Sequence, residues 1–123
     1  MATDPHILYI EDERPVLELA RWALNLSGYK LSAATSGQQG LTMMRQRKPD
    51  LLLLDLMMRD FNGWDVYREI KNDEQLADIP VIVVTATSLE HSRTIIDDLP
   101  PVDGFITKPF DVDRLIRSIE RYL

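Results

Sequence analysis

The side chains of this chain that could do chemistry share one position, because each stands where a short apolar run ends. They are Glu11, Asp12, Asp55, Thr85 and, just after the last such run, Lys108. If the three carboxylates lie about 4 Å apart, each pair repels by roughly 4 kcal/mol at an effective dielectric of about 20, so a cation must offset them. Carboxylate oxygens, a backbone carbonyl and water are hard ligands that suit Mg²⁺. The pattern therefore predicts a Mg²⁺ site.

A carboxylate beside a bound divalent cation can also act as a nucleophile toward phosphorus. Asp55 is the candidate, because an aspartate can carry a phosphoryl group as an acyl phosphate. Phosphoryl transfer depends on positioning and on neutralising the oxygens of the transferring group, for which Mg²⁺, the Lys108 ammonium and the Thr85 hydroxyl are suited. We expect the stem of Lys108 to be exposed and to contribute little to the core.

These side chains can meet only if the runs before them are parallel strands of one sheet. The chain alternates short apolar runs with longer segments of helical periodicity, which is the pattern of βαβ units. The runs LLLL and VIVV lack alternation, as expected of central strands covered on both faces. A right-handed, doubly wound α/β sheet follows, with its ligands at the carboxyl ends of the strands. The predicted strands are 6–10, 30–34, 51–55, 80–85 and 102–106, and the predicted helices are 13–27, 37–47, 63–71, 89–98 and 111–122.

Two helix surfaces leave alternatives open. In the first predicted helix, Leu19 and Leu26 belong to the apolar stripe expected to cover the sheet, and Trp22 lies at its edge, as core or as a contact surface. The last predicted helix carries a polar stripe that is either an ordinary solvated face or a partner surface. That stripe consists of Arg114, Arg117 and Arg121.

Length and composition limit the classes of protein to consider. The 123 residues fit one domain, 1–123, and no apolar run approaches the roughly 18 residues of a membrane-spanning helix. The first residues have neither a basic segment nor an apolar one, so we expect a cytoplasmic protein. Without cysteine there are no disulfides or thiolate metal sites. A net charge of -6 argues against nucleic acid as a direct partner.

The order and spacing of four motifs resemble the receiver domains of bacterial response regulators. The motifs are IEDER at 10–14, LLLLDLMM followed by D, N, G and W at 51–64, VIVVTA at 81–86 and FITKPF at 105–110. Each is weak alone, but together they cover nearly the whole chain. The resemblance implies a flavodoxin-like (βα)5 three-layer sandwich with strand order 2-1-3-4-5. It also implies a phosphorylation switch that receives its phosphoryl group from a sensor histidine kinase or a histidine-phosphotransfer protein.

The resemblance also assigns the metal ligands by position. Asp12 and Asp55 match the direct ligands of Mg²⁺, and Glu11 matches an acidic residue that acts through water. The backbone carbonyl of Met57 matches a third protein ligand.

Three further positions match residues that respond to the phosphoryl group. Lys108 matches the phosphate-binding lysine of the family, and its peptide bond to Pro109 is expected to be cis. Thr85 and Phe105 match the pair of residues that switch position on phosphorylation.

The chain departs from the family pattern at two places. Arg59 stands where the family usually has proline, which is expected to loosen the loop after Asp55. The stretch 97–104 replaces a small-residue turn, so the helix before it is expected to be short or irregular. Two variable positions, Met57 and Thr87, are expected to set the lifetime of the phosphorylated state.

Other interpretations fit parts of the pattern. Glu11 and Asp12 alone are typical of a helix start, and Asp55 alone of a turn. An aspartyl-phosphate enzyme of the dehalogenase type would have a second acid at Met57 and an inserted cap segment, and this chain has neither. A phosphorylation-independent interaction module would not need five chemically competent site positions. Nucleotide binding is disfavoured because the chain contains neither of the glycine-rich phosphate-binding motifs, GxGxxG and GxxxxGK followed by S or T.

The output is expected to pass to a separate molecule or domain, because the chain ends on its last predicted helix. The recipient is either a downstream protein target or a fused output domain. The sequence leaves both arrangements open.

Overall fold

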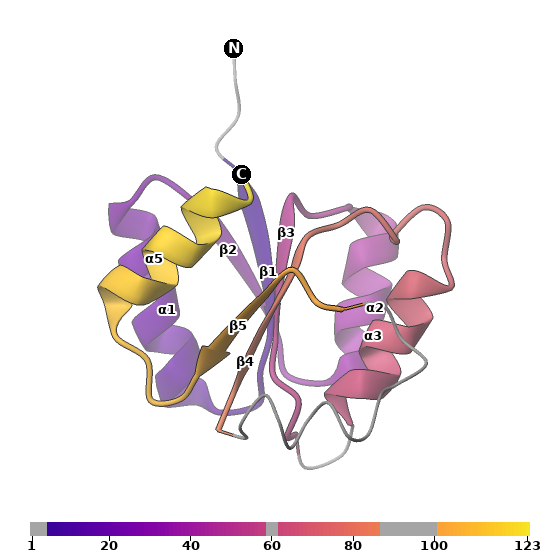
Figure 1. The fold of residues 1–123 in the computed structure, drawn as a ribbon, viewed down its shortest axis with the longest axis horizontal. Helices are drawn as coiled ribbons and strands as arrows, with labels where there is room; N and C mark the ends of the chain where they lie inside the picture. Colours follow the sequence, from indigo (N-terminus) through magenta and orange to yellow (C-terminus); the bar gives the residue numbers. More distant parts are fainter. Residues whose placement is uncertain (1–4, 59–61, 87–100) are drawn as a thin grey trace.

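A parallel sheet forms the centre of the computed structural model, which describes residues 5–58, 62–86 and 101–123. The sheet has five strands in the order β2-β1-β3-β4-β5, which confirms the predicted topology (Figure 1). The strands are β1 (His6–Ile10), β2 (Lys30–Ala34), β3 (Leu51–Leu54), β4 (Val81–Thr85) and β5 (Gly104–Thr107).

Strand β5 begins later than the sequence predicts, at Gly104 instead of 102. The reason is the side chain of Asp103, whose Oδ2 accepts a 2.8 Å hydrogen bond from the Val81 N–H. The N–H of Asp103 donates in turn to the Val81 carbonyl at 3.0 Å. The Asp103 side chain thus takes the place of a backbone acceptor for Val81, and the regular pairing of β4 with β5 starts with Ile82 and Gly104.

Helices cover both faces of the sheet and complete three layers (Figure 1). One face carries α1 (Arg14–Leu26) and α5 (Val112–Arg121), and the other carries α2 (Gly37–Gln46) and α3 (Gly63–Lys71). The predicted helix 89–98 lies outside the described residues, as does Arg59. Among the residues the structure describes, no helix is both long enough and apolar enough to cross a membrane.

Local side-chain chemistry sets where the helices begin and end. Pro15 lies in the first turn of α1, where its missing N–H costs nothing. Gly28 follows that helix with a φ of 87°, a conformation that glycine adopts without a steric penalty. The side chains of Ser36, Asn62 and Asp111 accept backbone N–H bonds at the starts of α2, α3 and α5. Each such cap contributes about 1 kcal/mol.

The core consists of two apolar clusters, one on each side of the sheet. Along β3, Leu52 and Leu54 face α2 and α3, while Leu51 and Leu53 face α1 and α5. All four leucines are fully buried. Strands covered on both faces explain why these runs show no polar alternation.

The predicted covering stripe of α1 is wrong at two positions. Leu19 is 41% exposed and Leu26 is 70% exposed, because the helix meets the sheet along a narrower line of Leu17, Ala20 and Leu24. Trp22, which the sequence left undecided, is 59% exposed and belongs to the outer surface.

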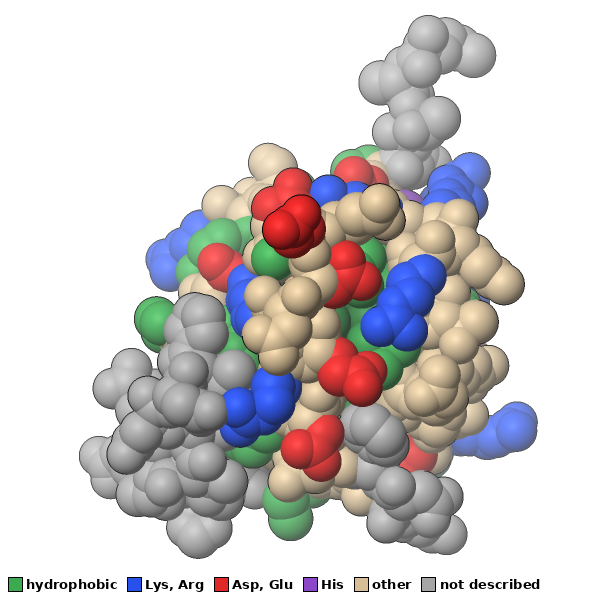
Figure 2. All heavy atoms as spheres, turned by 90° about the vertical axis from the view of Figure 1, so that its right-hand side faces the viewer, with side chains coloured by type: hydrophobic (Ala, Val, Ile, Leu, Met, Phe, Trp, Pro, Cys, Tyr) green, Lys and Arg blue, Asp and Glu red, His purple; other side chains and the backbone are tan. Residues whose placement is uncertain are grey.

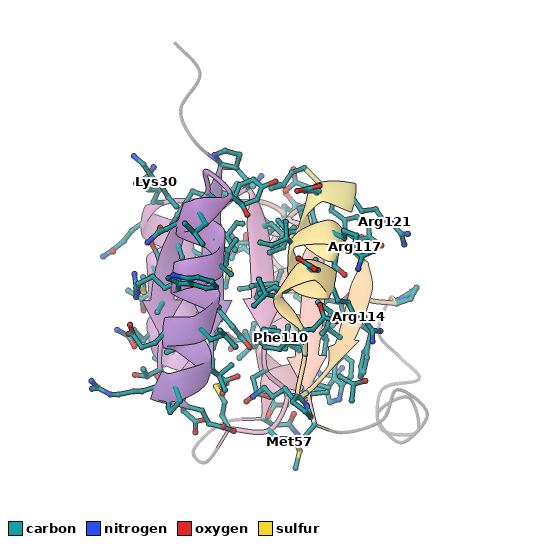
Figure 3. The ribbon with its side chains drawn as sticks, turned by 90° about the vertical axis from the view of Figure 1, so that its left-hand side faces the viewer. Lys30, Met57, Phe110, Arg114, Arg117 and Arg121 are labelled. Carbon is teal, nitrogen blue, oxygen red and sulfur yellow. The ribbon has the colours of Figure 1, made fainter. Side chains whose placement is uncertain are left out.

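The polar stripe of α5 lies on the outer surface as predicted. Figure 3 shows Arg114, Arg117 and Arg121 projecting from α5 on the side away from α1. All three side chains are exposed.

The face formed by α2 and α3 carries acidic and basic side chains interspersed with one another (Figure 2). The surface ion pairs of the chain include Arg45 with Asp73 at 3.7 Å and Lys48 with Asp78 at 2.6 Å. Exposed pairs contribute at most about 1 kcal/mol. The stability of the fold therefore comes from the two apolar clusters.

Gly63 holds the loop after β3 against the strand, and replacing it should disturb that contact. A Cβ at this position would lie 2.4 Å from the Asp55 carbonyl oxygen and 2.6 Å from the Leu56 Cα. Because both neighbours are backbone atoms, Gly63→Ala should lower the free energy of unfolding by about 2 kcal/mol. Urea denaturation measures this.

Gly28→Ala provides the comparison, because a Cβ there meets no atom within 4 Å and only its φ of 87° is unfavourable. That variant should lose about 1 kcal/mol. A Gly63→Ala protein as stable as the parent would contradict the close approach.

Candidate functional site

The carboxyl ends of β1 and β3 bring three carboxylates together. Glu11, Asp12 and Asp55 each offer an oxygen, and these oxygens lie within 4.8 Å of one another. Glu11 is fully buried and Asp55 is 1% exposed, whereas Asp12 is half-buried. The Asp55 N–H donates to the Ile10 carbonyl at 3.0 Å, which sets the end of β3 beside the end of β1, and the Glu11 N–H donates to the Ala34 carbonyl at the end of β2 at 2.9 Å.

Lys108 reaches into this group of carboxylates from the segment after β5. Its Nζ lies 2.5 Å from Glu11 Oε2, 3.4 Å from Asp55 Oδ2 and 3.7 Å from Glu13 Oε1. The peptide bond between Lys108 and Pro109 is cis, as the family resemblance implied.

The expectation of an exposed Lys108 stem is wrong, since its side chain is only 12% exposed. The Lys108 N–H donates to the Thr85 carbonyl at 2.8 Å, which brings the residue close to the end of β4. From this position near the end of β4, the Lys108 side chain extends to the carboxylates of Glu11 and Asp55.

Glu11 is held by three donors. Its Oε1 accepts the Glu13 N–H at 3.2 Å, and its Oε2 accepts the Tyr9 hydroxyl at 3.2 Å as well as the Lys108 contact. Sequence reasoning missed Tyr9. The signal was available, because residues two apart on a strand share a face, and Tyr9 precedes Glu11 by two positions.

Burial and charge shift the protonation of these groups. Burial, together with the nearby Asp55 charge, raises the pKa of Glu11 to about 7, although Lys108 partly opposes the change. Burial alone would lower the pKa of Lys108, but its hydrogen bond to Glu11 and the charges of Asp55 and Glu11 outweigh this and raise it. Burial and the Glu11 charge also raise the pKa of Tyr9. Tyr9 therefore stays protonated and Lys108 stays charged at neutral pH.

Asp55 has one oxygen held and one open. Its Oδ1 accepts the Met57 N–H at 3.2 Å, whereas Oδ2 is buried and has no hydrogen-bond partner among the residues that the structure describes. The Met57 side chain is 67% exposed at the edge of the molecule (Figure 3). A buried carboxylate oxygen that lacks a hydrogen-bond partner among the described residues and lies beside the Lys108 ammonium is suited to attack an electrophile.

The two residues of the predicted switch pair lie on neighbouring strands. Thr85 ends β4 and is fully buried. Phe105 lies on β5 opposite Val83, and its half-buried ring packs against the core cluster beneath α2 and α3. Thr87 lies outside the described residues.

Known proteins resemble this chain along nearly its whole length. The family model for the response regulator receiver domain matches residues 7–120. The phosphate regulon regulatory protein PhoB of Pseudomonas aeruginosa is 37% identical over 95% of this chain and 51% of its own length. The polar-differentiation response regulator DivK of Brucella ovis is 33% identical over 95% of this chain and 94% of its own length.

Solved structures show the same fold. A sensor protein from Polaromonas sp. superposes with a TM-score of 0.88 at 26% identity, covering 96% of this chain and 94% of that one. The response regulator TrrA of Thermotoga maritima, solved in complex with Mg²⁺ and BeF, gives 0.84 at 28% identity, covering 97% and 99%.

The lengths of the relatives differ. The chain spans about half of PhoB and of the Synechocystis regulator RpaA, which it covers to 51% and 49%, but nearly all of DivK. All three relatives contain the region that this chain matches. The chain therefore belongs to the response regulator receiver domain family, the phosphoacceptor switches of two-component signalling.

Proposed function

We propose that Asp55 is the residue that accepts the phosphoryl group, from a sensor histidine kinase or a histidine-phosphotransfer protein. The observation that carries this proposal is the buried Asp55 Oδ2, which has no hydrogen-bond partner in the described part of the chain and lies 3.4 Å from the Lys108 ammonium. An oxygen with a free lone pair beside a fixed positive charge is suited to attack an electrophilic phosphorus. We place this activity in one cytoplasmic receiver domain that spans residues 1–123.

The donor set around Asp55 fits Mg²⁺. Three carboxylate oxygens within 4.8 Å of one another are hard ligands, and the open Asp55 Oδ2 is one of the buried atoms that a cation would satisfy. Asp12 and Asp55 would hold the ion directly, Glu11 through water, and the Met57 carbonyl would complete the protein ligands. When bound, Mg²⁺ neutralises oxygens of the transferring group.

Asp55, Lys108 and Thr85 have different roles in the proposed phosphoryl transfer. Asp55 forms a bond from its carboxylate oxygen to phosphorus while the bond from phosphorus to the donor's imidazole nitrogen breaks. The Lys108 ammonium then pairs with a phosphoryl oxygen, and the Thr85 hydroxyl donates a hydrogen bond to another. Both groups come from the ends of neighbouring strands, so the sheet positions them in advance.

The same contacts are proposed to operate the switch. The Thr85 side chain turns toward the phosphoryl group, and the Phe105 ring moves into the space that Thr85 vacates. Phosphorylation thereby shifts the population of molecules from one conformation to another with a different surface. The affected surface includes β5 and the adjacent α5. The signal passes to a downstream protein target or to a fused output domain. Support for both arrangements comes from the relatives, since the match covers half of PhoB and most of DivK.

Phosphorylation should require both Asp55 and Mg²⁺. Incubation with acetyl phosphate and Mg²⁺ should add one phosphoryl group by intact mass, and Asp55→Asn or EDTA should abolish the addition because each removes a necessary part of the site. Asp50→Asn is the matched control. That residue flanks the opposite end of β3, where its Oδ2 accepts the His6 N–H at 2.7 Å. A phosphorylated Asp55→Asn protein would falsify the assignment.

Lys108→Ala should weaken both the fold and the transfer. Glu11 and Asp55 would lose the positive charge between them, which should lower the free energy of unfolding in EDTA by about 2 kcal/mol. The loss stays below the usual cost of breaking a buried pair because Glu11, with its raised pKa, can take up a proton. Added Mg²⁺ should restore part of the stability, and phosphorylation should remain slower.

The control for this variant is Lys48→Ala, which removes an exposed partner of Asp78. It should change the stability by less than about 0.5 kcal/mol. Urea denaturation with and without Mg²⁺ and a time course of intact mass measure the two effects. Equal stability losses in the two variants would show that Lys108 does not neutralise a buried charge.

Met57→Asn should shorten the life of the phosphorylated state. The Met57 thioether is a weak acceptor, so it cannot orient a water toward the phosphorus, whereas an amide both donates and accepts. The decay after removal of the donor should accelerate several-fold, which corresponds to a barrier lowered by about 1 kcal/mol. Met57→Leu keeps an apolar side chain at this exposed position and should decay like the parent. If Met57→Asn decays no faster, water orientation at this position does not limit hydrolysis.

A further inference from the structure

Tyr9 is a buried polar residue that the proposed transfer does not use. It lies on β1, in the cluster beneath α1 and α5, and it is fully buried. Its hydroxyl donates to Glu11 Oε2 at 3.2 Å. The same oxygen lies 2.5 Å from Lys108 Nζ, so one carboxylate oxygen connects the phenol to the ammonium.

The position of the Tyr9 hydroxyl is fixed by the fold. Tyr9 lies on β1, and Glu11 directly follows the last residue of that strand, so the two side chains, two positions apart, project from the same face and meet in a hydrogen bond. The ring is packed among apolar side chains, including those of Ile7 and Leu53, and it cannot move without opening the core. Because the same Glu11 Oε2 also faces the Lys108 ammonium, which can only donate, this oxygen accepts and the phenol donates to it.

The orientation of the Glu11 carboxylate depends on this donor. The Glu13 N–H holds Oε1 at 3.2 Å, and Tyr9 with Lys108 holds Oε2. Without the phenol, one of the two fixed donors from the protein framework is lost and the carboxylate can turn about its last bond. Lys108 is then free to move closer to Asp55 Oδ2, now 3.4 Å away, where it competes with a divalent cation.

We infer that Tyr9 is a positioning residue, whose hydroxyl fixes the Glu11 carboxylate so that Lys108 lies beside Asp55 without occupying the place of the metal. Where it concerns Mg²⁺, the inference rests on the proposed function. Tyr9 touches neither the metal nor the phosphoryl group and acts through Glu11.

The competing explanation is that Tyr9 only fills the core and that its hydroxyl bonds to the nearest acceptor. A second buried tyrosine separates the two explanations. Tyr67 is also fully buried, on α3 at the other face of the sheet, and its hydroxyl donates to the Pro101 carbonyl at 3.1 Å. Tyr9→Phe and Tyr67→Phe each remove one buried hydroxyl and keep the ring, so a purely structural role predicts similar behaviour.

The first measurement uses the metal-free protein. The NMR signals of the Lys108 ε-methylene and ammonium report the surroundings of Nζ, and they should shift in Tyr9→Phe and keep the parental values in Tyr67→Phe. Unshifted signals in Tyr9→Phe, or equal shifts in both variants, overturn the inference. This measurement does not depend on metal binding or phosphorylation.

The second measurement is a calorimetric titration with Mg²⁺. Tyr9→Phe should bind the ion about tenfold more weakly, the effect typical of losing a hydrogen bond that orients a ligand group, and Tyr67→Phe should bind it like the parent. A parent that binds Mg²⁺ and a Tyr9→Phe protein that binds it equally well overturn the inference. A parent that neither binds Mg²⁺ nor becomes phosphorylated on Asp55 refutes the proposed function instead, and the Lys108 signals then decide the role of Tyr9.

Discussion

The burial of two carboxylates at one edge of the sheet is the constraint on which the rest of the site depends. Glu11 and Asp55 are almost completely removed from water, and Asp12 lies beside them. Charges in such a place must be paired, protonated or bound to a metal, because an uncompensated buried charge is strongly destabilising. Lys108 supplies one positive charge against three carboxylates. The remaining negative charge makes the site receptive to a divalent cation and then to an electrophilic phosphorus.

The fold tolerates these buried carboxylates because the strands that hold them are packed in a hydrophobic core. Glu11 and Asp55 directly follow β1 and β3, which lie inside the sheet and have apolar clusters on both faces. Such packing holds strand ends in fixed register, which keeps the carboxylates together despite their repulsion. Gly63 adds to this, since the loop after β3 can lie against the strand only where no Cβ intervenes. The stability of the core thus supports a local arrangement that would be unfavourable alone.

The sequence was informative wherever a local pattern had a single structural meaning. Apolar runs ending in polar residues located the strand ends, and with them the groups that the structure brings together. The strand order came from the family resemblance, since periodicity does not say which strands are neighbours. The exposure of Leu26 and the burial of Lys108 were mispredicted because both depend on how the elements pack against one another. Tyr9 was missed because a phenol within an apolar strand is also typical of ordinary core packing.

Lys108 connects the resting site with its proposed signalling state. In the structure, its ammonium neutralises Glu11 and Asp55, yet the proposed mechanism needs the same charge on a phosphoryl oxygen. One ammonium can serve both purposes only if another cation replaces it among the carboxylates when the phosphoryl group arrives. A divalent cation held by the carboxylates would supply the positive charge that Glu11 and Asp55 need, so that the Lys108 ammonium could pair with a phosphoryl oxygen. The hydrogen bond from the Lys108 N–H to the Thr85 carbonyl would keep the backbone of Lys108 at the end of β4 while its ammonium changes partners.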